Sequence, residues 1–130
     1  MNKNILIMLA ILILPIFAYF YLDRGQAVST SQINSAKPTV IKFSSDMCSE
    51  CQKMEQTVDQ VYQKYAGKIT LVKVPVQKQS KEVQTLIKQY NVTLVPTTVF
   101  KKSNGNTMAR IEGAMSNTEF EQYLKRLLNE

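Results

Sequence analysis

The chain has 130 residues, 45% of them hydrophobic, and its 16 basic and 10 acidic residues leave a net charge of +6. This length suits one compact domain, and because Lys101 and Lys102 are the only adjacent lysines, the charge predicts a solvated basic surface and no nucleic-acid partner. Two cysteines and no histidine cannot supply the four ligands of a structural zinc site. We therefore expect no metal and no cofactor, apart from the alternative of a metal shared between two chains.

An uncharged run of 18 residues, Ile5–Leu22, lies near the amino terminus. A helix needs roughly 20 apolar residues to span a bilayer, so residues 1–24 predict a membrane anchor or a signal segment, and the length favours the uncleaved anchor. Lys3 precedes the run, whereas Asp23 and Arg24 cancel after it, which places the amino terminus in the cytoplasm. We expect a single-pass protein of the cell membrane, with one transmembrane helix and an extracytoplasmic domain.

The rest of the chain divides into a polar, serine-containing stretch over residues 25–37, which predicts a tether and a short start to the fold, and a domain over residues 38–130. Hydrophobic patterns predict strands at 39–43, 69–76, 94–100 and 107–111, and helices from about 48 to the stop at Gly67, around 83–90, and after a capping box of Ser116 and Glu119. The order strand, helix, strand, helix, hairpin, helix predicts an α/β fold with a mixed central sheet and helices on both faces.

Both cysteines lie in the stretch DMCSECQKME, as Cys48 and Cys51. A purely structural disulfide is the simplest interpretation, but a loop of two residues removes little entropy from the unfolded chain. A redox pair accounts for the spacing better. Cys48 is expected in the first turn of a helix, where the helix dipole stabilises a thiolate that attacks a substrate disulfide, and Cys51 lies one turn further on, where it resolves the mixed disulfide. The pair predicts thiol–disulfide exchange.

Three stretches carry a resemblance to a known family: IKFSSDMCSEC (Ile41–Cys51), YNVTLVPTTVF (Tyr90–Phe100) and EGAMS (Glu112–Ser116). In them the sequence resembles the thioredoxin family, over roughly residues 39–128. The resemblance implies a thioredoxin-like fold. A full-length first strand and helix of that fold do not fit before residue 38, so we expect an abbreviated N-terminal part.

The resemblance also implies a substrate-binding segment at Val95, Pro96 and Thr97. Family members place a cis-proline there, facing the cysteines, and the backbone of Val95 would pair with an extended substrate segment. Gly113 matches a family glycine that allows close approach near the site. These assignments follow from the resemblance and not from the spacing of the residues.

Several positions depart from the family pattern. Met47 stands where the family commonly has tryptophan, and Ser49 and Glu50 replace glycine and proline between the cysteines, so substrate choice cannot be carried over. The family's buried acid falls on Lys42. Strand alternation leaves two alternatives for this lysine: it points beneath the cysteines and tunes a thiolate or its proton, or its amine reaches water.

The direction of electron flow is expected from the charges near the pair. Asp46 and Glu50 flank Cys48 and weaken the reduced form relative to the disulfide, which favours a reductase or isomerase-like activity over an oxidase, whereas Lys42 and Lys53 act in the opposite direction. We expect disulfide-containing protein substrates outside the cytoplasm, a transmembrane thiol carrier as electron donor, and a monomer. Two alternatives are a tethered binding module with a structural disulfide and a dedicated oxidase of one secreted client.

Overall fold

The structure is a computed structural model that describes residues 2–22 and 36–129. The first element is the helix α1 (Lys3–Leu22), which contains Pro15 and carries large apolar side chains that are exposed along its length, Ile7, Leu12 and Phe17 among them. No helix within the described ranges has both the length and the apolar character to cross a membrane. The anchor expected over residues 1–24 therefore stays a prediction from the sequence, and the predicted tether lies almost entirely outside the described residues.

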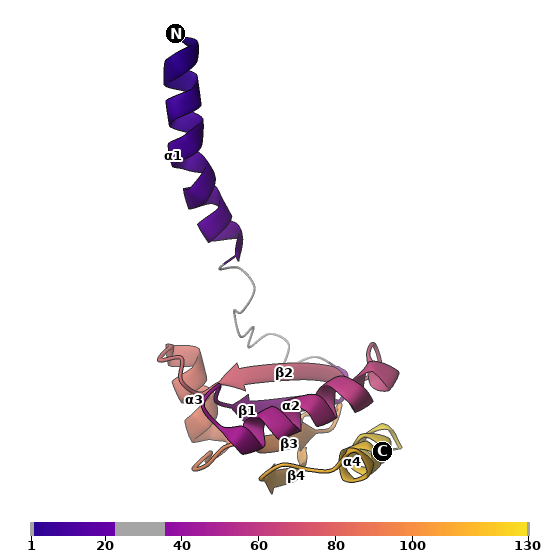
Figure 1. Cartoon of the computed structure of the whole chain (residues 1–130). Coiled ribbons are helices and arrows are strands. Elements are labelled where there is room, and N and C mark those ends of the chain that lie inside the picture. Colours follow the sequence, from indigo (N-terminus) through magenta and orange to yellow (C-terminus); the bar gives the residue numbers. More distant parts are fainter. Residues whose placement is uncertain (1, 23–35, 130) are drawn as a thin grey trace.

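The domain follows the predicted order of elements (Figure 1). It consists of β1 (Thr39–Ser44), α2 (Ser49–Val61), the short 3₁₀ helix η3 (Tyr62–Tyr65), β2 (Thr70–Pro75), α3 (Lys81–Gln89), β3 (Thr97–Lys101), β4 (Thr107–Glu112) and α4 (Asn117–Leu128). The strands form one sheet in the order β2-β1-β3-β4, in which β1 pairs parallel with β2 and antiparallel with β3, and β3 pairs antiparallel with β4. The predicted mixed sheet is confirmed.

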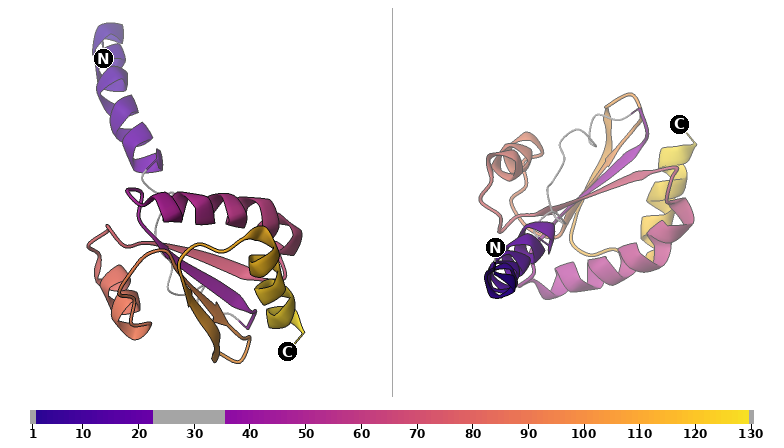
Figure 2. Two further views of the ribbon diagram at one scale, coloured as in Figure 1. Left: turned by 60° about the horizontal axis from the view of Figure 1, so that its bottom comes forward. Right: turned by 90° about the horizontal axis from the view of Figure 1, so that it is seen from above.

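Helices cover both faces of this sheet (Figure 2). Because side chains alternate along a strand, Val40 faces α2 and α4, whereas Ile41 and Phe43 face α3. Each face has its own apolar core, formed on the first by residues such as Met54, Phe100 and Phe120 and on the second by residues such as Val74, Leu86 and Val99. As β1 is buried on both faces, its carboxyl end is a rigid base for the loop that follows.

Two elements differ from the predicted ones by three residues or more at one end. The strand predicted over 94–100 begins only at Thr97, since Pro96 has no N–H to donate to a ladder and residues 94–96 form the loop that enters the strand. The helix predicted from about residue 48 to the stop at Gly67 is α-helical only to Val61, where α2 ends, and the chain continues as η3 to Tyr65. The amphipathic pattern predicts a helical region here but does not distinguish its α-helical part from its 3₁₀ part.

Candidate active site

The two cysteines sit where β1 gives way to α2. Cys48 has an extended backbone (φ −109°, ψ 120°) and is the N-cap of α2, so it precedes the first turn in which the sequence placed it. Its sulfur accepts a hydrogen bond from the backbone N–H of Cys51 at 3.2 Å. Both are free thiols; Cys48 is partly exposed, whereas Cys51 is 3% exposed. The arrangement gives one accessible sulfur and one shielded sulfur a helical turn apart.

The segment that was expected to face the cysteines does so. The Cys48 thiol donates to the carbonyl oxygen of Val95 at 3.7 Å, and the Val95–Pro96 peptide bond is cis, as the resemblance implies. Two hydrogen bonds hold the segment: Thr97 Oγ1 donates to the carbonyl of Leu94 at 2.7 Å, and the N–H of Gly113 donates to the carbonyl of Pro96 at 2.8 Å.

Gly113, which follows β4, has a backbone conformation that favours glycine. Its φ is +93°, a conformation that side-chain-bearing residues rarely adopt. A Cβ placed on it would meet no heavy atom within 4 Å, so close approach of a neighbour does not require glycine here. Within the described residues, the backbone conformation of Gly113 is what favours glycine, and the expected close approach near the site stays a prediction.

The environment of Cys51 opposes its ionisation. Burial is the largest cause that raises the pKa of its thiol, and the hydrogen bond and charge interaction with Cys48 raise it further. The backbone of Ser45 and the charge of Lys42 act in the opposite direction. Cys51 therefore keeps its proton more readily than an exposed cysteine does.

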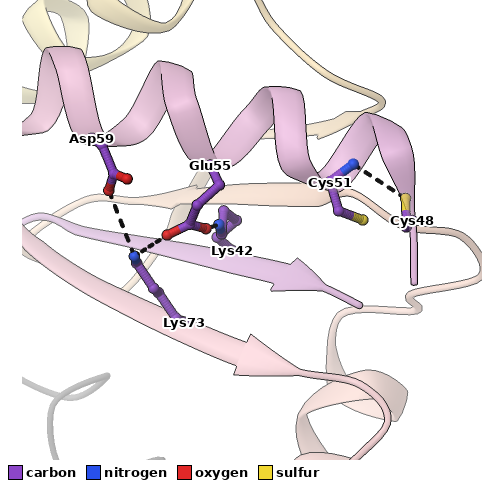
Figure 3. Close-up of polar contacts among 6 residues, drawn as sticks. All are labelled: Lys42, Cys48, Cys51, Glu55, Asp59 and Lys73. Carbon is purple, nitrogen blue, oxygen red and sulfur yellow. Dashed lines mark hydrogen bonds and ion pairs between the residues drawn. The ribbon is translucent and has the colours of Figure 1, made fainter. Parts of the chain in front are cut away.

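Lys42 of β1 is a fully buried lysine that lies beneath α2. Its side chain is 0% exposed, and its Nζ forms an ion pair with Glu55 of α2 (Figure 3). Burial, followed by the charge of Lys73, lowers the pKa of Lys42 from 10.5 to about 8, while Asp59 and Cys51 act to raise it. The alternative in which the amine of Lys42 reaches water is wrong, because the ammonium group lies under α2.

The sequence analysis assigned no role to Glu55. It lies four residues after Cys51, hence on the same face of α2, and its carboxylate forms ion pairs with both Lys42 and Lys73. The spacing from Cys51 was readable in the sequence. The register that brings Lys42 and Lys73 together under that face was not, because it depends on the pairing of β1 with β2.

The acidic residues that flank Cys48 have partners of their own. Glu50 pairs with Lys53 at 2.6 Å, and Asp46 accepts a hydrogen bond from Gln77 at 2.6 Å. Both contacts are exposed, so water screens their effect on the sulfur. Met47 is 97% exposed beside Cys48 and thus presents an apolar side chain next to the accessible thiol.

The described residues hold no cluster of three or more histidine, cysteine, aspartate or glutamate side chains placed to bind a metal ion. The two cysteines can cycle between a dithiol and a disulfide. Their positions are one helical turn apart, and the sulfur of Cys48 already accepts a hydrogen bond from the N–H of Cys51.

Comparison with known proteins adds three findings. Residues 25–128 match the family model of the thioredoxin-like domain. The chain is similar to mitochondrial thioredoxin of Bos taurus, with 27% identity over 109 residues that cover 84% of this chain and 63% of that protein. It is also similar to thiol:disulfide interchange protein DsbD of Yersinia pestis (strain Pestoides F), with 32% identity over 93 residues that cover 68% of this chain and 16% of that protein. The chain thus spans less than two thirds of the length of either relative.

The fold has solved counterparts as well. A structure of thioredoxin-2, a component of malaria parasite protein secretion machinery, aligns with a TM-score of 0.62 at 23% sequence identity and covers 69% of this chain and 82% of that one. This likeness concerns the arrangement of helices and strands.

Proposed function

Because this chain belongs to the thioredoxin-like domain family and has its fold, we propose that it is a thiol–disulfide oxidoreductase that acts on disulfides of other proteins through Cys48 and Cys51. The observation that carries the proposal is the pairing of one partly exposed and one buried free thiol at the amino terminus of α2, in a chain that matches the family over residues 25–128.

The chemistry follows from the positions of the two sulfurs. Cys48, as thiolate, attacks a substrate disulfide; a mixed disulfide forms and one substrate sulfur leaves with the electron pair. The N–H of Cys51 donates to the attacking sulfur, and a hydrogen bond to an ionised acceptor is stronger than one to a neutral acceptor. Cys51 then attacks Cys48, which releases the second substrate sulfur. We call this second reaction the resolving step.

The substrate is proposed to bind across the segment of Val95, Pro96 and Thr97. The carbonyl of Val95 already accepts a hydrogen bond from Cys48, so an extended peptide that pairs with the Val95 backbone brings its own disulfide to that sulfur. The exposed apolar side chains of Met47 and Leu94 flank this position and favour a substrate that is at least partly unfolded.

For the direction, we propose reduction or isomerisation of substrate disulfides rather than their formation. A strong oxidant requires a reduced form that is stabilised as a thiolate. Burial raises the pKa of Cys51, and Asp46 and Glu50 place negative charge near Cys48, so neither feature favours a stabilised reduced form. The pairing of Glu50 with Lys53 reduces the second of these effects without removing it.

For the location, we propose that the domain works outside the cytoplasm, as a monomer attached to the cell membrane by its amino-terminal segment. The support is the charge-free run Ile5–Leu22 and the exposed apolar side chains of α1. A transmembrane thiol carrier would then supply the electrons. Fractionation of cells that express the full chain, with carbonate washing and protease added from outside, tests this location; a protected, soluble protein would contradict it.

The test of the activity is catalytic reduction of insulin by dithiothreitol, followed by redox equilibration against glutathione. We expect turnover that requires both Cys48 and Cys51 and a potential near that of thioredoxin, about −270 mV. A potential near −120 mV would instead identify an oxidase. Absence of turnover, together with a disulfide that resists reduction, would favour the tethered binding module; Ser49→Ala serves as the matched control, since it changes the intervening sequence without removing a thiol.

A further inference from the structure

Two lysines lie side by side on the sheet beneath α2. Lys42 of β1 and Lys73 of β2 are paired in the strand register, and like charges directly opposite each other on neighbouring strands destabilise a sheet. The helix supplies the opposite charge: Glu55 forms ion pairs with both lysines, and Asp59 lies 3.9 Å from Lys73 (Figure 3). We call Lys42, Glu55, Lys73 and Asp59 the charge cluster.

Burial of Lys42, the inner member of the charge cluster, lowers the stability of the folded state. Lys42 is 0% exposed and lies on the face of β1 that also carries Val40, against the apolar side chains of α2. A buried ion pair seldom stabilises a protein more than well-packed apolar side chains of the same volume would. The position could hold an apolar residue, so the lysine calls for an explanation other than stability.

Cys51 supplies that explanation, because it is the buried group whose ionisation the resolving step needs. It precedes Glu55 by one turn of α2, and Lys42 lies beneath this part of the helix (Figure 3). The two groups act on each other as an ammonium and a thiolate do: the charge of Lys42 lowers the pKa of Cys51, and the charge of Cys51 raises the pKa of Lys42.

We propose that Lys42 is a positioning residue of the resolving step, whose ammonium group, fixed by Glu55, stabilises the thiolate of Cys51. The proposal rests on the proposed exchange through Cys48. In the step, the Cys51 thiolate attacks Cys48, a sulfur–sulfur bond forms between the two cysteines, and the bond from Cys48 to the substrate breaks. The substrate sulfur leaves with the electron pair and takes up the proton that Cys51 gave up, so the cysteine pair is oxidised and the substrate sulfur is reduced.

The pH dependence follows from the groups that face Lys42. These are Lys73 from β2, the hydroxyl of Thr98 from β3, and Cys51, Glu55 and Asp59 from α2. As the pH rises through about 8, Lys42 loses its proton and its help to the thiolate ends. The advantage that Lys42 confers on the resolving step is therefore largest below that pH.

The two chemical steps can be measured separately in the reduced full chain. An aromatic disulfide whose thiolate product absorbs visible light releases one product when Cys48 attacks and a second when Cys51 resolves. In Lys42→Met, we expect the first release at the wild-type rate and the second about tenfold slower at pH 7, because an opposite charge in a desolvated site changes an ionisation equilibrium by roughly that factor or more. The ratio of wild-type to variant rates should fall toward one above about pH 8.

Three further variants make the test specific. Lys42→Gln removes the same charge with a polar side chain and should slow the second release to a similar extent, and it decides the matter if Lys42→Met does not fold. Lys42→Arg keeps the charge and should restore most of the rate. Lys73→Met removes a cation from the other side of Glu55, and because Lys73 lowers the pKa of Lys42, it should extend the advantage of Lys42 to higher pH.

The outcomes separate this inference from the proposed function. If Lys42→Met and Lys42→Gln both show the second release at the wild-type rate, the role of Lys42 is overturned, while the exchange itself stands. A wild-type protein that releases no first product would overturn the exchange through Cys48. Slowing of the first release alone would also contradict the inference, since it would place the effect of Lys42 on the wrong cysteine.

Discussion

Replacement of Lys42 by methionine is expected to stabilise the protein, although it removes one partner of an ion pair. Burial, with the charge of Lys73, lowers the pKa of Lys42 from 10.5 to about 8, a difference of about 2.5 units. Since a pKa difference of one corresponds to roughly 1.4 kcal/mol, keeping the ammonium form buried costs about 3.5 kcal/mol at pH 7. Glu55 would not be left alone by the change, because it is 38% exposed and still pairs with Lys73.

The sign of the pH dependence follows from the same shift. The folded-state pKa of Lys42 lies below the unfolded value, so the unfolded chain binds more protons between about pH 8 and pH 10.5. The cost of Lys42 is fully present below pH 8 and is relieved as the pH rises toward 10.5. The stability advantage of Lys42→Met should therefore be greatest at neutral pH and shrink over that window.

Urea unfolding of the reduced wild type and of Lys42→Met, at steps from about pH 6 to about pH 10.5, measures this difference, and the comparison cancels groups that titrate alike in both proteins. Lys73→Met is the matched control: its side chain is 47% exposed, so its removal should change the free energy of unfolding by about 1 kcal/mol or less. A Lys42→Met protein that is less stable than wild type at pH 7, or whose advantage does not change with pH, would show that burial of the ammonium group is not costly.

Three other substitutions test single features of the structure: a helix cap, a backbone conformation and an exposed side chain. Ser116→Ala removes the N-cap whose hydroxyl accepts from the N–H of Glu119 and should lower the free energy of unfolding by about 1 kcal/mol in a denaturant titration; an unchanged midpoint would contradict this role. Gly113→Ala places a side chain at a φ of +93° and should cost about 1 kcal/mol in the same titration, whereas a neutral result would mean that the backbone relaxes without strain. Met47→Asp should raise the KM for insulin while leaving thermal stability within about 0.5 kcal/mol, because the side chain is 97% exposed beside Cys48; an unchanged KM would exclude Met47 from the substrate surface.

Local patterns in the sequence were sufficient for the elements of the domain and for the cysteine pair. The β-branched run of residues 39–43 predicts a strand, and the helical spacing of Met54, Val58 and Val61 reflects burial of one face of α2. The positions of Cys48 and Cys51 follow from the junction of β1 with α2. The cis bond before Pro96 was expected only through the resemblance, because no local pattern distinguishes it from an ordinary strand-entry proline.

The features that the sequence did not reveal depend on registers between elements. The burial of Lys42 and its ion pair with Glu55 require both the pairing of β1 with β2 and the rotation of α2 above them. An isolated lysine in an otherwise apolar strand fits a buried position and a surface-reaching one equally well. Likewise, the extended backbone that makes Cys48 an N-cap differs from a first-turn position by one residue, which is within the usual uncertainty of a helix boundary.

The measurement that tests the exchange most directly is a trap of the mixed disulfide. Full-length Cys51→Ser and, as the matched control, Cys48→Ser are each incubated with a disulfide-bonded protein substrate, and the adducts are mapped by mass spectrometry after alkylation. We expect a stable adduct on Cys48 in the first variant and little adduct in the second, because Cys51 is 3% exposed. Equal trapping on both cysteines, or no adduct in either variant, would contradict the exchange.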